Sequence, residues 1–325
     1  MNTTTAGEAE ARRRSELIGI ACVLLSALTL ALKGIFAKYV FAEGVDVVTV
    51  LALRNALAFP MLALVGAWLV GGFSRLAMPP RDLGLAMVGG LIGYWIASLL
   101  DFTALTMIDV SVERVLLFSF PVFVLILEAI RSRRLPPPRQ VIALVGAEAG
   151  IVLVMGATDL DLFLANLEGG LWAIGSAFVF SFYYMLNQHL GPRLGSARMA
   201  LAAVGGAVLG TCGQFLATEP LSALDISGAA WGWTAAMAFF CSVVPFLAIT
   251  EGIRRVGASR SALISTVGPV ATLVLAALLL DERLTPTQLG GAALVFVAIL
   301  SLEGRLPRWR AFRRRVPPSR EAGSP

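Results

Sequence analysis

The chain has 325 residues, of which 57% are hydrophobic and only 14% are charged. Because soluble proteins average about 25% charged residues, this composition excludes an ordinary soluble domain and indicates a polytopic membrane protein. The net charge of +5 does not indicate nucleic-acid binding, because Lys and Arg lie almost wholly in the short links between apolar runs.

Ten apolar segments follow one another along the chain, and each reaches or approaches the length of about 20 residues that crosses a bilayer as a helix. They cover residues 17–40, 47–70, 83–104, 108–130, 139–157, 168–190, 195–217, 229–250, 257–280 and 287–304. No small-residue cleavage site follows the first segment, so it is predicted to be a retained span. The sequence therefore predicts an all-α polytopic membrane protein with ten transmembrane helices.

The links between these segments alternate in charge, which predicts the orientation of the chain. One set is basic and contains Arg12, Arg13, Arg14, Arg75, Arg81, Arg131, Arg133, Arg134, Arg139, Arg193, Arg198, Arg254, Arg255, Arg260 and the residues from 305 onward. The other set, apart from Arg283, is acidic and contains Glu43, Asp46, Asp109, Asp159, Asp161, Glu168, Glu219, Asp225, Asp281 and Glu282. By the positive-inside rule both termini are predicted to be cytoplasmic.

An internal repeat is indicated by two prolines inside apolar segments, Pro121 and Pro269, which lie 148 positions apart. The same offset places Ser111 on Ser259. Each unit would contain five spans, and because five is odd the second unit would be inverted relative to the first, as in alternating-access carriers. We expect a cytoplasmic N-terminal tail (1–16), two five-helix repeats (17–157 and 167–304) and a basic, disordered cytoplasmic tail (305–325).

Ionisable residues inside predicted spans gather in the first repeat. They are Lys33, Arg54, Asp101, Glu113, Arg114 and Glu148. Each costs on the order of 3 kcal/mol in a membrane if unpaired, so such residues usually serve a function. Two interpretations stay open: the three acids and three bases neutralise one another and hold the bundle together, or they form a site for a polar substrate or a proton.

Residue types within this set suggest separate roles. Lys33 and Arg54 are expected to bind an anionic group of a substrate, and Glu148 or Glu113 to respond to protons. Further candidates for lining the substrate site are Tyr94, Trp95, Asp101, Glu113, Arg114, Tyr183 and Asn187. Pro121 and Pro269 would mark bending helices at the gates, because proline removes a backbone donor from a helix. Isolated cysteines and a single histidine predict neither a metal site nor a cofactor.

The layout resembles the EamA type of the drug/metabolite transporter superfamily over about residues 17–155 and 167–303. The residues that carry the resemblance are Leu32–Lys33–Gly34, Arg54, Thr103–Ala104–Leu105, Pro121, Glu251–Gly252–Ile253, Pro269 and Asp281–Glu282–Arg283–Leu284. The family often has a Gly-Glu pair after each proline-containing span. Asp281–Glu282 resembles this pair, whereas the first repeat has Arg133–Arg134–Leu135 there and lacks the glutamate.

The resemblance implies a secondary carrier, often an exporter, of small metabolites, amino acids or drugs. We expect an anionic or zwitterionic substrate, with a cation or multidrug exporter using Glu148, Asp101 and the aromatic residues as the alternative. The lack of clustered catalytic groups disfavours an integral-membrane enzyme. The short inner links disfavour an ATP-driven permease subunit, and the buried charges disfavour a non-transporting scaffold or receptor. The expected partners are a small-molecule substrate and the lipid bilayer of a bacterial inner membrane, with a homodimer left open.

Overall fold

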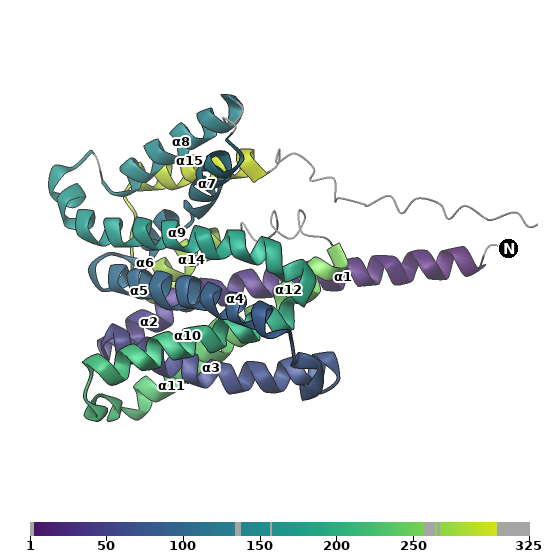
Figure 1. Ribbon diagram of the computed structural model, residues 1–325. Coiled ribbons are helices and arrows are strands. Elements are labelled where there is room, and N and C mark those ends of the chain that lie inside the picture. The colour runs from purple at the N-terminus through teal and green to yellow at the C-terminus, as the bar shows by residue number, and fades with distance from the viewer. Residues whose placement is uncertain (1–2, 134–137, 157, 257–263, 265–266, 304–325) are drawn as a thin grey trace, which may run out of the picture.

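The computed structural model describes residues 3–133, 138–156, 158–256, 264 and 267–303. Within these residues every regular element is a helix and no strand is present. Figure 1 shows a bundle of roughly aligned helices from which the start of α1 (Thr3–Ala31) extends at one end. The expected all-α fold is confirmed.

The first half of the chain forms ten helical segments within the described residues. In chain order they are α1, α2 (Lys33–Ala42), α3 (Val47–Val70), the 3-10 turn η1 (Phe73–Leu76), α4 (Pro80–Gly90), the π-helical η2 (Leu91–Ile96), α5 (Ala97–Met107), α6 (Val110–Leu117), α7 (Phe120–Ser132) and α8 (Pro138–Val154). Pro121 is the second residue of α7, so the predicted fourth span is a broken helix.

The second half repeats this order. Its segments are α9 (Leu160–Leu194), α10 (Ser196–Thr218), the 3-10 turn η3 (Leu221–Leu224), α11 (Gly228–Ala238), the π-helical η4 (Phe239–Val243), α12 (Val244–Val256), α14 (Val267–Leu279) and α15 (Pro286–Glu303). α9 begins well before the predicted start at residue 168, because the Asp159 carboxylate caps it by accepting from the backbone N–H groups of Asp161 and Leu162 at 3.1 and 3.2 Å.

Seven of the helices in the described residues are long and apolar enough to cross a membrane. They cover Arg13–Ala42, Val47–Val70, Pro80–Met107, Val110–Arg131, Leu160–Gly191, Ala197–Thr218 and Gly228–Ile249. Three shorter apolar helices, Val145–Val154, Val267–Leu279 and Pro286–Ala298, fall at the predicted fifth, ninth and tenth segments. The protein is therefore a multi-pass membrane protein.

The 148-residue offset is visible in the backbone. Shifting η1 by 148 positions gives η3, and shifting α4 gives α11, without any change of length. The two π-helical turns also begin 148 positions apart. Arg133 and Asp281 occupy equivalent positions and both have a left-handed backbone, with φ of 52° and 54°. Two copies of one structural unit therefore make up the bundle.

Glycines allow the closest helix contacts of the bundle. A Cβ on Gly90 of α4 would lie 1.8 Å from the carbonyl oxygen of Ala203 on α10. Gly150 on α8 and Gly291 on α15 face each other, and a Cβ on either would lie 2.7 Å from the carbonyl oxygen of the other. Small residues at helix crossings are the usual means of close association in membranes.

We predict that Gly90→Ala lowers the melting temperature of the purified protein in detergent by several degrees, because the added methyl group overpacks the α4–α10 contact at a typical cost of about 1–3 kcal/mol. Gly84→Ala on the same helix is the matched control, since nothing lies within 4 Å of a Cβ there. Equal melting temperatures for the two variants would contradict the close contact.

Candidate functional site

Lys33 stands at a break between two helices. α1 ends at Ala31 and α2 begins at Lys33, so the helix is interrupted at Leu32. The Lys33 ammonium forms an ion pair with the Asp101 carboxylate of α5 and lies 3.8 Å from an Oε1 atom of Glu113 on α6. The side chain of Lys33 is 13% exposed, that of Asp101 5%, and that of Glu113 is fully buried.

The ring of Phe102 lies close to both Lys33 and Arg54, the two cations expected to bind an anionic group. The Lys33 ammonium lies 5.7 Å from the ring centroid and the Arg54 guanidinium carbon lies 5.2 Å from it. Both distances permit a cation–π attraction, which gains strength away from water. Arg54 is buried on α3; its Nη2 donates to the Asn55 side-chain oxygen at 3.4 Å, and its Nε finds no hydrogen-bond partner among the described residues.

Glu113 and Arg114 enter the same cluster from the first turns of α6. Neither carboxylate oxygen of Glu113 accepts a hydrogen bond from a described residue. Arg114 donates through Nη2 to the carbonyl oxygen of Leu30 at 3.3 Å, at the last turn of α1. A cation near a helix C-terminus is favourable because the carbonyl groups there carry partial negative charge. Arg114 therefore has a backbone partner, whereas Glu113 interacts with Lys33, Arg114 and the Asp101 carboxyl group.

Aromatic side chains lie beside this cluster. Tyr183 of α9 donates its hydroxyl to that of Tyr94 at 3.2 Å, with ring centroids 4.9 Å apart. Phe246 of α12 packs on the other side of Tyr94 at 5.3 Å. Tyr94 lies in η2 and interacts electrostatically with Arg54. Both repeats thus contribute aromatic surface next to the buried charges.

Three of the predicted site residues lie elsewhere. Trp95 donates its indole N–H to the Gln214 side chain of α10 at 2.6 Å and packs against Gly210, which is a helix-packing role. Asn187 is half-buried on α9, with its side-chain oxygen directed toward Gly191. Glu148 does not lie with the other five charges: it is exposed on α8, whose Gly150 face packs against α15.

The structure adds two residues that the sequence analysis did not select. Phe102 carries no polar group and gave no signal beyond its place next to Asp101. Cys241 of η4 donates its thiol to the Thr29 carbonyl oxygen at 3.2 Å and interacts with Arg54, Lys33 and Arg114. Its signal was its position in the repeat, 148 residues after Gly93. Cys241 brings the second repeat into contact with the charge cluster.

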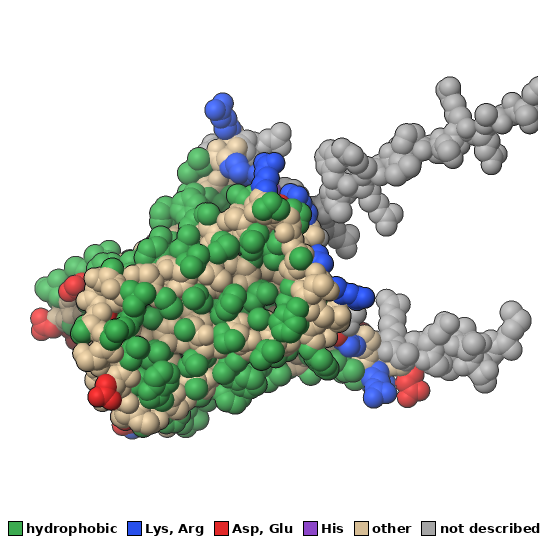
Figure 2. Space-filling model, turned by 60° about the horizontal axis from the view of Figure 1, so that its bottom comes forward, with side chains coloured by type: hydrophobic (Ala, Val, Ile, Leu, Met, Phe, Trp, Pro, Cys, Tyr) green, Lys and Arg blue, Asp and Glu red, His purple; other side chains and the backbone are tan. Residues whose placement is uncertain are grey.

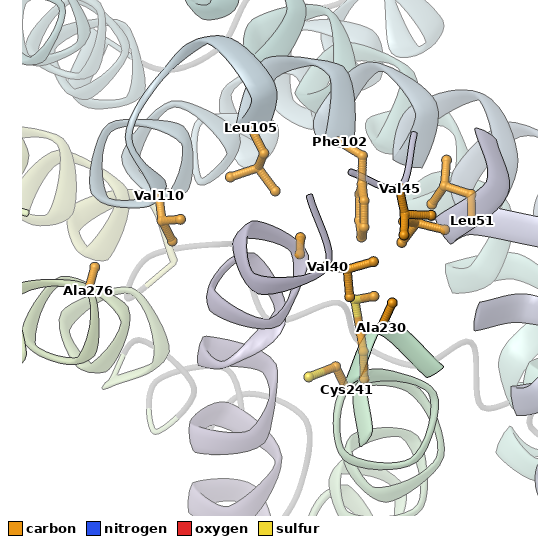
Figure 3. Packing of buried hydrophobic residues seen from close by; sticks show 12 residues of the cluster. Val40, Val45, Leu51, Phe102, Leu105, Val110, Ala230, Cys241 and Ala276 are labelled. Atoms are coloured by element: carbon orange, nitrogen blue, oxygen red, sulfur yellow. The ribbon is translucent and has the colours of Figure 1, made fainter. Parts of the chain in front are cut away.

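A pocket of about 470 Å³ opens at one end of the bundle. Its lining includes Lys38, Asp46 and Thr106, and none of the clustered charges. Figure 3 shows the apolar layer beside it, in which Phe102 lies near Val45. In the described part of the chain, no group of three or more His, Cys, Asp or Glu residues could hold a metal ion.

Comparison with known families decides the class of the protein. The description "EamA-like transporter family" matches residues 17–156 and 167–303, one match for each repeat. The chain belongs to the EamA-like transporter family. This membership makes it a membrane transporter rather than an enzyme, and it confirms the resemblance and the two-repeat organisation.

Individual relatives agree with the EamA-like assignment. The uncharacterized transporter YcbK of Bacillus subtilis is 32% identical over 308 residues, covering 92% of this chain and 96% of its own length. The uncharacterized transporter YyaM of the same organism is 26% identical over 69% of this chain and 74% of its own. A crystal structure with 20% identity and a TM-score of 0.59, covering 91% of this chain and all of that one, shares the fold.

We predict that Asp101→Asn destabilises the protein by about 3–5 kcal/mol, because it leaves Lys33 buried without its closest counter-ion. The double variant Lys33→Met with Asp101→Asn should recover most of this loss, since it removes the orphaned cation as well. Thermal unfolding in detergent measures both effects, with Asp281→Asn at an exposed ion pair as the control. An additive loss in the double variant would contradict the pairing.

Proposed function

We propose that this EamA-like transporter is a secondary active carrier that exports a small anionic or zwitterionic metabolite by alternating access. Lys33, Arg54 and Phe102 would form the floor of the substrate site, with Tyr94 and Tyr183 beside it. The buried charges face several helices of both repeats, which is where carriers built from repeats place their substrates.

The observation that carries the proposal is an excess of positive charge in the cluster. With Glu148 outside it, the cluster holds three cations (Lys33, Arg54 and Arg114) and two carboxylates (Asp101 and Glu113). Arg54 forms no ion pair with any residue that the structure describes. Arg54 interacts electrostatically with Asp101, which is already paired with Lys33, so a buried guanidinium that shares its counter-ion favours a carboxylate or other anionic group of a substrate.

Glu113 is the better candidate for the proton-responsive acid. It is fully buried, lies 3.8 Å from the Lys33 ammonium and interacts with the Asp101 carboxyl group. A proton shared by the two carboxyl groups, or a substrate ammonium group, could bind there. Glu148 lacks contact with the cluster, which argues against a direct role in coupling to substrate.

The proposed architecture has ten spans in two inverted five-helix repeats (17–157 and 167–304), with both termini cytoplasmic. The matching order of helices and the odd number of spans per repeat support the inversion. Figure 2 supports the orientation, because Lys and Arg side chains gather at the end from which the N-terminal helix extends, and Asp and Glu side chains gather at the opposite end. The break before Pro121, and the place of Pro269 in the first turn of α14, would let the ends of α7 and α14 bend as gates, in a bacterial inner membrane.

We predict that cells overproducing the protein release an anionic or zwitterionic metabolite, and that Lys33→Ala with Arg54→Ala abolishes this release. The reason is that the double variant removes both cations flanking Phe102. Metabolites in the medium would be compared at equal amounts of protein in the membrane.

Arg283→Ala is the matched control for that comparison. The side chain of this arginine is 86% exposed, and its ion pair is with Asp281, outside the cluster. Release that persists undiminished in the double variant would exclude the proposed role of the cation pair.

We predict that Glu113→Gln uncouples transport from the proton gradient while Glu148→Gln does not. In reconstituted vesicles the Glu113 variant should still exchange the metabolite across the membrane but should fail to accumulate it when a pH gradient is imposed. Normal accumulation by the Glu113 variant, or its loss in the Glu148 variant, would reverse the assignment.

A cation or multidrug exporter is the second candidate, and the observation that favours it is the fully buried Glu113 in a charge cluster whose Arg54 interacts with Tyr94, next to Tyr183 and Phe246. Protonated amines bind to such a combination of carboxylate and aromatic rings. Resistance to a lipophilic amine that depends on Glu113 and not on Arg54 would select this function over the first.

A further inference from the structure

The N-terminus of α6 is capped from the other repeat. One carboxylate oxygen of Glu282 accepts the backbone N–H of Val110 at 2.8 Å, and the other accepts the backbone N–H of Ser111 at 2.9 Å and the Ser111 hydroxyl at 2.8 Å. These bonds join residues 171 and 172 positions apart in the sequence. A carboxylate at a helix N-terminus is strongly favoured, because the first N–H groups lack partners within the helix.

The residue that should cap this helix locally does not do so. Asp109 is the N-cap residue of α6 and has the extended backbone typical of that position, yet its side chain makes no capping hydrogen bond. Asp is among the best N-cap residues. Partial burial and the nearby Glu282 carboxylate raise the pKa of Asp109, so the two acids lie close to each other at this helix end.

The Glu282 contact closes one end of the molecule. Asp281 has a left-handed backbone that turns the chain after α14, so that the next residue reaches α6. Val110 packs against Ala276 of α14 in the same apolar layer (Figure 3) and fills the space above Gly34 of α2. The Tyr39 hydroxyl donates to the Leu279 carbonyl oxygen at 3.2 Å, and its ring lies 4.9 Å from that of Trp233. Spans of both repeats thus meet around the first turn of α6.

The same helix carries the buried acid of the substrate site. Glu113 lies two residues after Ser111, so whatever holds the first turn of α6 also fixes the position of Glu113 beside Lys33. Position 134, the equivalent of Glu282 in the first repeat, is arginine in the sequence and lies outside the described residues. Arginine has no acceptor for helix N–H groups, so the chain encodes this type of cap once.

We infer that Glu282 and Asp109 are alternative caps of α6 and that their exchange opens and closes this end of the transporter. With Glu282 bound, the end is closed and Glu113 is held next to Lys33. When Glu282 leaves, the Asp109 carboxylate rotates onto the N–H group of Ser111, so that opening does not leave this buried donor unpaired. The helix end is a two-state element whose states differ by which carboxylate occupies it. This inference rests on the alternating access of the proposed function.

The test uses Cys241 as a reporter, because this thiol is buried in the same apolar cluster as Val110 and Ala276. In a protein carrying Cys22→Ala and Cys212→Ala, a membrane-impermeant maleimide would label Cys241 in right-side-out and inside-out vesicles. Glu282→Gln should raise the labelling rate about tenfold from the side that this end faces, because the amide offers one acceptor oxygen in place of a bidentate carboxylate. Asp109→Ala should lower the rate below that of the parent, because the open state loses its cap.

Asp281→Asn is the matched control, since it changes an adjacent acid that is 85% exposed and pairs only with Arg283 at 3.4 Å. Its labelling rate should equal that of the parent. Equal rates in the Glu282→Gln variant and this control would overturn the inference. If the Glu282 variant does not reach the membrane, a rate for Asp109→Ala at or above that of the parent overturns it equally.

The labelling experiment needs no substrate, so it separates the two proposals. Changed labelling in a protein that exports nothing would leave the exchange of caps standing and remove the carrier function. If the protein exports the metabolite but its labelling does not respond to these variants, the exchange of caps is excluded and the carrier function stands.

Discussion

The ion pair between Lys33 and Asp101 is the interaction on which the polar interior of this protein depends. It connects the break between α1 and α2 with the middle of α5, and a third charge, Glu113, lies 3.8 Å from the lysine. Without a counter-ion, each of these groups would be expensive to bury in a membrane. With the pair in place, Arg54 makes no ion pair of its own among the described residues and shares Asp101 with Lys33, and the proposed substrate site rests on that inequality.

The two repeats share a backbone pattern but differ in their charged residues. Helix lengths, 3-10 turns, π-helical turns and left-handed residues recur at an offset of 148 positions. The charged residues do not recur: the sequence has Ser181, Ala202, Ile249 and Ser261 at the positions equivalent to Lys33, Arg54, Asp101 and Glu113. One repeat therefore supplies the charges, while the other supplies aromatic surface through Tyr183 and Phe246, the Cys241 thiol, and the carboxylate of Glu282. Such a division suits a carrier whose two halves move relative to each other.

Much of the fold could be predicted from the sequence, because hydropathy, proline positions and the charge of the links act locally. The π-helical turns could not, since they come from how long helices pack and leave no pattern in apolar residues. Five of the six intramembrane charges lie together as the hypothesis of a common site required. Glu148 does not, because its rotational position on α8 is decided by the Gly150–Gly291 contact with α15. Similarly, the sequence identified Glu282 as part of a family motif but could not show which helix it contacts 171 residues away.

The π-helical turn η2 affects the direction in which the side chains that follow it point around the helix axis. A π-helical turn accommodates one more residue than an α-helical turn of the same height. Each residue of an α-helix advances the side-chain direction by about 100°, because a full turn takes 3.6 residues. The extra residue in Leu91–Ile96 therefore determines in which direction around the axis of α5 the side chain of Asp101 points. A chain of identical hydropathy with one residue fewer before Asp101 would still cross the membrane, yet it would direct this carboxylate away from Lys33 and toward a different neighbour.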